Sequence, residues 1–375
     1  MIKIICAVIA ELNPLHKGHE RLINFARENS NGCVVVLSSN FTQRGSPSII
    51  DKFFRAESAI NAGADLVIEL PFLYSCSAAK DFARGAVEIL GRLNFVDSIA
   101  FGMENVDFDV EKLIDVVLNE NQDYKNFLRS ELDTGASFPK ANSIALEKIL
   151  PGSFDFISKP NNMLALSYMA EIKKHDYKLK ILKLKREGNF RSKDIREKIL
   201  TSLSFTQPLC EGVIKMAYES GRISDENKLW PLLQNIFIRS NPQDLRKIYG
   251  IDEGIENLFL KHWRFSHDFS DFIGRCVCSR YTRAHIRRRL IYVLLNLNRD
   301  DVIENLKIKI PYARLLAFNQ NGRKILKNHS DIKIITRLGK EKNFFSQTEF
   351  QASQLYELTL NLPNMSRETN TVIKF

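Results

Sequence analysis

Long hydrophobic runs are missing from this chain of 375 residues. No apolar stretch approaches the roughly 18 residues that a membrane span requires, and the first residues lack the charged, apolar and small-residue order of a cleaved signal peptide. Cysteine is scarce as well: of six cysteines, only Cys276 and Cys278 lie close together, and their C-x-C spacing fits neither a zinc knuckle nor a redox pair. These absences predict a cytoplasmic protein with no membrane span.

The sequence also lacks internal repeats and low-complexity tracts, and its 44% hydrophobic and 26% charged residues are ordinary for a globular protein. In residues 1–200, short apolar runs alternate with amphipathic segments, the pattern of βαβ units around a parallel sheet. Beyond residue 200 the pattern changes to consecutive helices. We therefore predict an α/β fold, with a Rossmann-like parallel sheet in residues 1–200 and a mainly helical, basic domain in residues 201–375.

The first candidate site follows a predicted strand near the N-terminus. The apolar run IICAVIA (4–10) is soon followed by Asn13-Pro14, which stops regular strand pairing, and His16-Lys17-Gly18-His19 then opens a predicted helix. Imidazoles three residues apart share one face of a helical turn, and a helix N-terminus favours an anion. We predict a phosphate site here. A metal site is less well supported, because no third His, Cys or carboxylate lies at a suitable spacing.

Other polar groups follow the predicted strands, where open α/β sheets bind ligands. Gly102 and Glu104 come after one strand, while Asn161 and Asn162 precede a helix. One of the two asparagines is a candidate N-cap, and the helix N-terminus can bind a nucleotide at the same time. Lys52 and Arg55 lie on a predicted helix over residues 51–62. A solvated helix face is the favoured interpretation of both, and contact with a triphosphate is the alternative.

An arginine-rich segment stands out in the second half, and the net charge of +10 suits a polyanionic partner. In residues 282–296, Arg283, Arg287 and Arg288 crowd the side opposite an apolar stripe, with Arg280 just ahead. The segment is either an RNA-backbone surface or a solvated basic helix.

Several motifs together carry a resemblance to a known family. NPLHKGH resembles the H-x-G-H motif of the nucleotidyltransferase superfamily. Six further stretches, spread over much of the chain, resemble the bacterial tRNA(Met) cytidine acetate ligase family. They are SSNFTQRG (38–45), AGADLVIELP (62–71), FGME (101–104), KPNN (159–162), RYTRAHIRRRL (280–290) and ARLLAFNQNG (313–322).

The resemblance implies a fold of the nucleotidyltransferase type and a ligase that uses ATP, with Mg²⁺, to activate acetate as acetyl-adenylate. The acetyl group would then pass to the exocyclic amine of the wobble cytidine of elongator tRNA(Met). The basic pattern makes tRNA contacts of Arg280, Arg283, Arg287 and Arg288, and the resemblance assigns catalysis to His16, His19 and Lys17. It assigns ATP binding to a larger set: Ile9, Ala10, Glu11, Leu12, Asn13, Pro14, Leu15, Gly18, Glu20, Arg21, Leu22, Gly102, Asn161, Asn162, Arg186, Ser192 and Arg196.

One segment departs from the family pattern. A second phosphate motif keeps Ser192 and Arg196 but has Arg191 and Lys193 at its other positions, and the preceding loop is shortened to residues 188–190. Two alternatives therefore stay open, a small-molecule adenylyltransferase and a non-catalytic tRNA-binding protein. The basic second half argues against the first, and the retained histidines argue against the second. The sequence is compatible with a homodimer and does not identify the acid that is activated.

Overall fold

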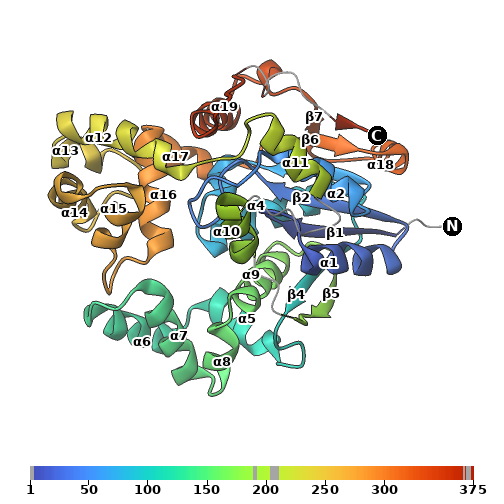
Figure 1. Cartoon of the computed structure of the whole chain (residues 1–375). Coiled ribbons are helices and arrows are strands. Elements are labelled where there is room, and N and C mark those ends of the chain that lie inside the picture. Colours follow the sequence, from blue (N-terminus) through green and yellow to red (C-terminus); the bar gives the residue numbers. More distant parts are fainter. Residues whose placement is uncertain (1–3, 189–191, 203–210, 366–367, 369–372) are drawn as a thin grey trace.

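A mixed, mostly parallel sheet forms the centre of the computed structural model, which describes residues 4–188, 192–202, 211–365, 368 and 373–375 (Figure 1). Its strand order is β5-β4-β1-β2-β3-β6-β7, with β8 paired to β6. The strands are β1 (Ile5–Ala10), β2 (Gly32–Ser38), β3 (Leu66–Leu70), β4 (Ser98–Met103), β5 (Lys180–Lys185), β6 (Tyr312–Phe318), β7 (Lys333–Ile335) and β8 (Ile373–Lys374). Strands β1 to β5 are parallel, and β6 runs antiparallel to β3.

The central strands are buried on both faces. Every residue of β1, β2 and β3 is buried, which explains why their sequences read as continuous apolar runs and do not alternate. Ile5, Ala7 and Ile9 join the core on one face, whereas Cys6 and Val8 join the core on the other. Two helical layers therefore fix the sheet from both sides.

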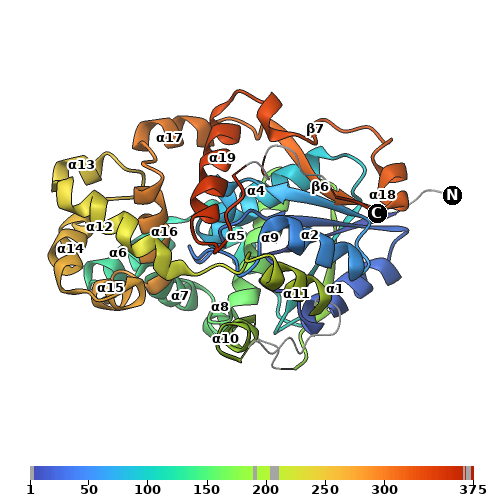
Figure 2. The ribbon, with the colours of Figure 1, turned by 45° about the horizontal axis from the view of Figure 1, so that its top comes forward.

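One layer contains α1 (Lys17–Glu28), α2 (Lys52–Asn61), α10 (Ser192–Ser202) and α11 (Glu211–Glu219), while α4 (Ala79–Arg92) and α9 (Pro160–Lys174) cover the opposite face (Figures 1 and 2). Short α3 (Phe72–Ser75) follows β3, and α18 (Gln320–Ile325) and α19 (Phe344–Glu357) accompany the C-terminal strands.

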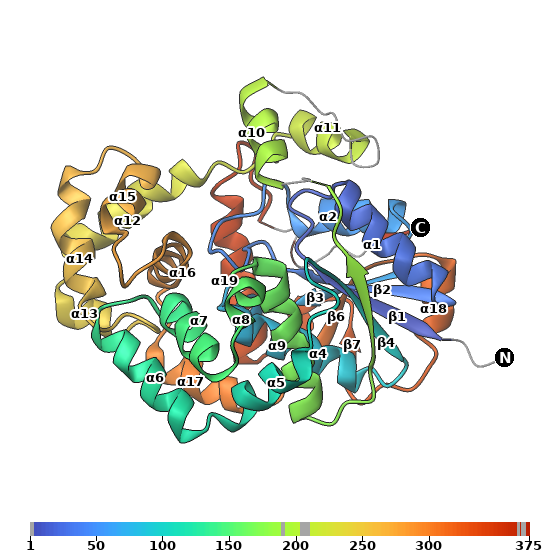
Figure 3. The ribbon, with the colours of Figure 1, turned by 90° about the horizontal axis from the view of Figure 1, so that it is seen from below.

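Two helical groups lie beyond the carboxyl ends of the parallel strands (Figures 1 and 3). The first group is inserted between β4 and α9: α5 (Val110–Asn119), α6 (Gln122–Asp133), α7 (Phe138–Ile149) and α8 (Ser153–Ile157). The second is α12 (Trp230–Arg239), α13 (Pro242–Arg246), α14 (Ile255–His262), α15 (Phe269–Cys276), α16 (Arg283–Leu294) and α17 (Arg299–Lys307). Among the described residues, each helix is too short or too polar to cross a bilayer.

The α/β fold class predicted from the sequence is confirmed. The sheet extends further along the chain than predicted, because β6, β7 and β8 come from beyond residue 200 and continue it from β3. The boundary proposed near residue 200 therefore marks the start of a series of helices, after which the chain re-enters the same sheet at β6.

Candidate active site

The two histidines of the H-x-G-H motif cap helix α1 where β1 delivers the chain. His16 is the N-cap residue, and its Nδ1 accepts a hydrogen bond from the Gly18 N–H at 3.0 Å. The Nδ1 of His19 accepts one from the His16 N–H at 3.3 Å, which completes a capping box. The rings stack with their centroids 3.8 Å apart. The motif thus holds both imidazoles rigidly at a helix N-terminus.

This capping fixes the protonation of both rings. Burial, and after it the Arg186 guanidinium, lowers the pKa of His16 to about 4; burial, His16 and Arg186 lower the pKa of His19 well below its ordinary value. Both are therefore neutral near pH 7. Because each Nδ1 accepts a backbone hydrogen bond, the single proton of each neutral ring belongs on Nε2. The pair presents two Nε2–H donors suited to a phosphate.

Gly18 makes this arrangement sterically feasible. A Cβ built at position 18 would lie 2.9 Å from His16 Cε1 and 3.1 Å from its Nδ1. A larger residue would push the ring away from the N–H that it caps. Lys17, the first residue of α1, is exposed and available to a ligand.

The predicted ATP-binding residues before His16 form the floor of the site. Ile9 and Ala10 end β1, and Leu12 and Leu15 are buried, so their side chains pack in the core and leave the main chain for binding. Asn13 precedes a cis peptide bond to Pro14, and its Oδ1 accepts the Ile49 N–H at 2.8 Å.

Three further predicted residues occupy α1 beyond the histidines. Leu22 packs against the core, and Glu20 is half-buried. Arg21 forms an ion pair at 2.9 Å with Glu187, which follows β5. Only Glu20 and Arg21 therefore offer polar side chains at the edge of the site.

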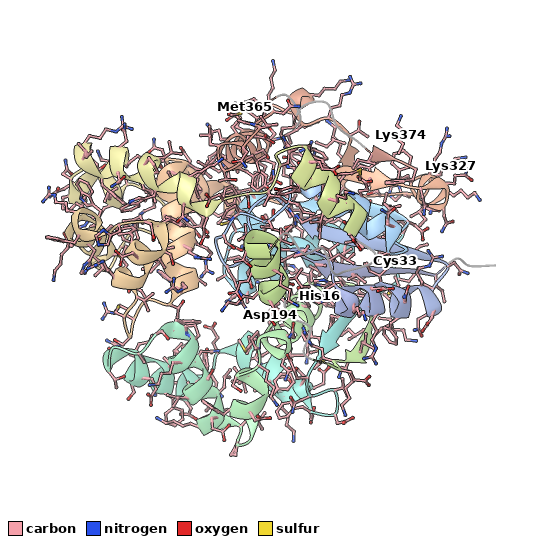
Figure 4. All side chains as sticks on the ribbon, viewed as in Figure 1. His16, Cys33, Asp194, Lys327, Met365 and Lys374 are labelled. Atoms are coloured by element: carbon pink, nitrogen blue, oxygen red, sulfur yellow. The ribbon has the colours of Figure 1, made fainter. Side chains whose placement is uncertain are left out.

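Two distant arginines reach the β1–α1 turn. Arg196 of α10 donates from Nη1 to the main-chain oxygen of Asn13 at 2.6 Å. Arg186 follows β5 and lies close enough to affect the pKa of both histidines. Figure 4 labels His16 at the start of α1 and Asp194 on α10. Ser192 is the first residue of α10. Arg191 and the shortened loop at residues 189–190 lie outside the described residues.

The end of β4 forms a second part of the site with the start of α9. Asn162 is fully buried, and its Oδ1 accepts the Glu104 N–H at 2.9 Å. Asn161 donates from Nδ2 to Glu104 Oε1 at 2.6 Å. The other oxygen of Glu104 is buried without a partner among the described residues. Gly102 lies beside Arg186, whose Cγ is 3.2 Å from the position of an added Cβ. The Glu104 carboxylate, a hydrogen-bond acceptor, thus lies near the Gly102 backbone, which has no side chain to block a ligand. Both features suit an adenosine.

The N-cap role considered for Asn161 and Asn162 is wrong. The N-cap of α9 is Lys159, with Pro160 at the first helical position. Asn161 and Asn162 follow inside the first turn, where their side chains tie α9 to the loop after β4.

Comparisons with known proteins agree with this geometry. The model of the HIGH nucleotidyl transferase family matches residues 3–371. A tRNA(Met) cytidine acetate ligase of Clostridium perfringens is 34% identical over 94% of both chains, and one of Oceanobacillus iheyensis is 31% identical, also over 94% of both. The crystal structure of Thermotoga maritima TmcAL bound with alpha-thio ATP superposes with a TM-score of 0.89 at 25% identity, covering 99% of this chain and 100% of that one.

The chain belongs to the tRNA(Met) cytidine acetate ligase family of HIGH nucleotidyl transferases. The resemblance inferred from the motifs is therefore confirmed.

Against this family background, the interpretation of Lys52 and Arg55 as a solvated face is wrong. Both side chains are fully buried. Arg55 donates to the main-chain oxygens of Glu11 at 2.7 Å and Ser39 at 2.6 Å, so it braces the ends of β1 and β2. Lys52 binds three buried glutamates. The alternative, contact with a triphosphate, fails for the same reason, because neither charged group is accessible.

The four arginines predicted to bind tRNA in this family member do not form one open surface. Arg280 and Arg283 are exposed. Arg287 donates to Glu226 Oε1 at 2.6 Å, and Arg288 donates to the main-chain oxygen of Gln43 at 2.9 Å. Arg288 thus fastens α16 to the loop after β2, and Arg287 fastens it to Glu226. No sequence motif indicated Glu226.

The histidine environment predicts a pH-dependent stability. Below about pH 6.5 the unfolded chain protonates His16 while the folded chain does not until about pH 4, so stability should decrease as pH falls through this window. The decrease between pH 6.5 and 5 should be about 1.5 kcal/mol for His16. Urea unfolding of wild type and His16→Asn, which keeps an N-cap acceptor, measures it.

The Asn variant should lose that part of the pH dependence. His329→Asn, at a side chain 80% exposed, should keep the wild-type dependence. An unchanged pH dependence in His16→Asn would contradict the neutral, buried state of His16.

Proposed function

We propose that this chain is an ATP-dependent ligase that activates acetate as acetyl-adenylate and acetylates the exocyclic amine of the wobble cytidine of elongator tRNA(Met). The stacked, capped His16–His19 pair at the end of β1 carries the proposal, because it places two imidazoles at a helix N-terminus, where a phosphate binds favourably. The relatives named tRNA(Met) cytidine acetate ligase, which match over 94% of both chains, support the choice of substrates.

The first step needs stabilisation of charge on phosphate. Acetate is a poor acyl donor, so its carboxylate attacks the α-phosphate of ATP, a P–O bond forms and pyrophosphate leaves. The Nε2–H groups of His16 and His19, with the N-terminus of α1, stabilise the charge that develops. Lys17, Arg186 and Arg196 are placed to hold the remaining phosphates. The side chains supply preorganised donors more than proton transfer.

The nucleoside is proposed to lie along the end of β4. Gly102 allows close approach of the adenosine, and the unpaired Glu104 oxygen accepts from an amino or hydroxyl group. Asn161 fixes the other Glu104 oxygen, and Asn162 fixes the Glu104 backbone.

Magnesium would arrive with the triphosphate. Among the described residues, the cluster of potential metal ligands is Glu69, Glu349 and Glu368, and Lys52 fills its centre. The ligands of the ion would therefore be phosphate oxygens and water, as Mg²⁺ commonly prefers.

The tRNA is proposed to reach the site across the second helical group, where Arg280 and Arg283 are exposed. The net charge of +10 supports a polyanionic partner. A tRNA substrate is consistent with a cytoplasmic protein. A homodimer stays a prediction.

Pyrophosphate exchange separates this function from its alternatives. With ATP and acetate, the protein should exchange labelled pyrophosphate into ATP, and with tRNA added it should yield acetylcytidine by mass analysis of nucleosides. Exchange without acetate dependence, or turnover only with a phosphorylated small molecule, would favour the adenylyltransferase. No exchange with retained tRNA binding would favour the non-catalytic protein.

A further inference from the structure

Glu11 is the one charge at the end of β1 that phosphate binding does not explain. It is half-buried and directly follows the strand, five residues before His16. A carboxylate here repels both a triphosphate and acetate, because all three groups are negatively charged. Its main chain could serve ATP, but that leaves the carboxylate unused.

The Glu11 side chain is nevertheless held firmly in place. Its Oε1 accepts the Gln43 N–H at 2.7 Å, and the main-chain oxygen of Gln43 accepts from Arg288 Nη1 at 2.9 Å. The main-chain oxygen of Glu11 accepts from the buried Arg55 at 2.7 Å. Helix α16 of the second helical group thus positions this carboxylate through one loop residue.

The Glu11 side chain interacts with a neighbouring cation, Arg196. Burial lowers the pKa of Arg196, and Glu11 is the foremost group opposing that shift, so the two side chains interact electrostatically. Arg196 also binds Asn13, two residues beyond Glu11. Glu11 therefore lies beside the same main chain as the proposed phosphate contacts.

The second step of the proposed reaction requires a proton acceptor that the histidines cannot provide. Both Nδ1 atoms accept backbone hydrogen bonds and both Nε2 atoms carry protons. Glu226 and Glu187 are each paired with an arginine side chain. Among the described residues at the end of β1, Glu11 is the carboxylate with one oxygen tied only to a neutral N–H.

We propose that Glu11 is the general base of acetyl transfer and that Arg288 is its positioning residue. The inference rests on the proposed function. The cytidine amine attacks the acetyl carbonyl, a C–N bond forms, the C–O bond to phosphate breaks, and AMP leaves with the bonding electrons. The amine proton passes to the Glu11 carboxylate and then to solvent.

Glu11→Gln tests the assignment, because its amide oxygen can still accept the Gln43 N–H. Acetate-dependent pyrophosphate exchange should stay within about threefold of wild type, while single-turnover transfer to tRNA falls at least about 100-fold and acetyl-adenylate accumulates. The acid limb of the transfer pH profile should disappear. Glu28→Gln, at the exposed end of α1, is the matched control and should change neither step.

Two further variants distinguish chemistry from folding. Glu11→Asp keeps a carboxylate and should retain measurable transfer, and Arg288→Gln should slow transfer about tenfold and shift its acid limb without raising the KM for tRNA. Equal loss of exchange and transfer in Glu11→Gln, or unimpaired transfer, would overturn the inference. Absence of acetate-dependent exchange in the wild type would instead overturn the proposed function.

Discussion

His19→Asn should lower acetate-dependent pyrophosphate exchange by about 100- to 1,000-fold while leaving the fold and the tRNA affinity intact. The Asn oxygen can replace Nδ1 as acceptor for the His16 N–H, so α1 keeps its cap. What disappears is the Nε2–H donor to the charge that develops on phosphate. His19→Ala also removes the acceptor of the His16 N–H, which is one half of the capping box, and should additionally cost about 1 kcal/mol of stability.

A second variant, at the exposed arginines, tests tRNA binding separately from catalysis. Arg280→Glu combined with Arg283→Glu should weaken tRNA binding and its salt dependence and leave pyrophosphate exchange unchanged. Arg287 and Arg288 are unsuitable for this control, because they hold Glu226 and Gln43. Filter binding and exchange assays measure the two properties. If each variant lost both properties equally, separate nucleotide and tRNA surfaces would be contradicted.

Local signals made the sheet and the histidine pair predictable. The apolar runs of β1 and β2 reflect burial on both faces, and H-x-G-H encodes its own capping box within four residues. Each of these features depends on neighbours in the sequence. The periodicity and the turn residues therefore sufficed to predict them.

The remaining site residues depend on partners far along the chain. Arg288 binds Gln43 across 245 residues, and Lys52 binds Glu349 across 297. On a sequence, both basic residues look like parts of solvated helices. Their partners could be identified only once the sheet and α19 were placed in space.

Five buried charged side chains form a cluster that joins α2, β3, β6, α19 and Glu368 near the C-terminus. Lys52 contacts Glu349 at 2.8 Å, Glu368 at 2.7 Å and also Glu69. Arg314 of β6 pairs with Glu69 at 3.2 Å and with Glu368. Burial and the neighbouring Glu69 raise the pKa of Glu349 to about 8, so near pH 7 this cluster is close to electrically neutral.

Lys52→Met should therefore destabilise the protein by about 3–5 kcal/mol, because it removes one cation and leaves buried carboxylates uncompensated. Urea unfolding with a fixed slope measures the loss. Lys178→Met breaks an exposed pair with Asp176, at a lysine side chain 82% exposed, and should cost less than about 1 kcal/mol. A Lys52→Met variant as stable as Lys178→Met would show that the buried carboxylates do not depend on Lys52 for compensation.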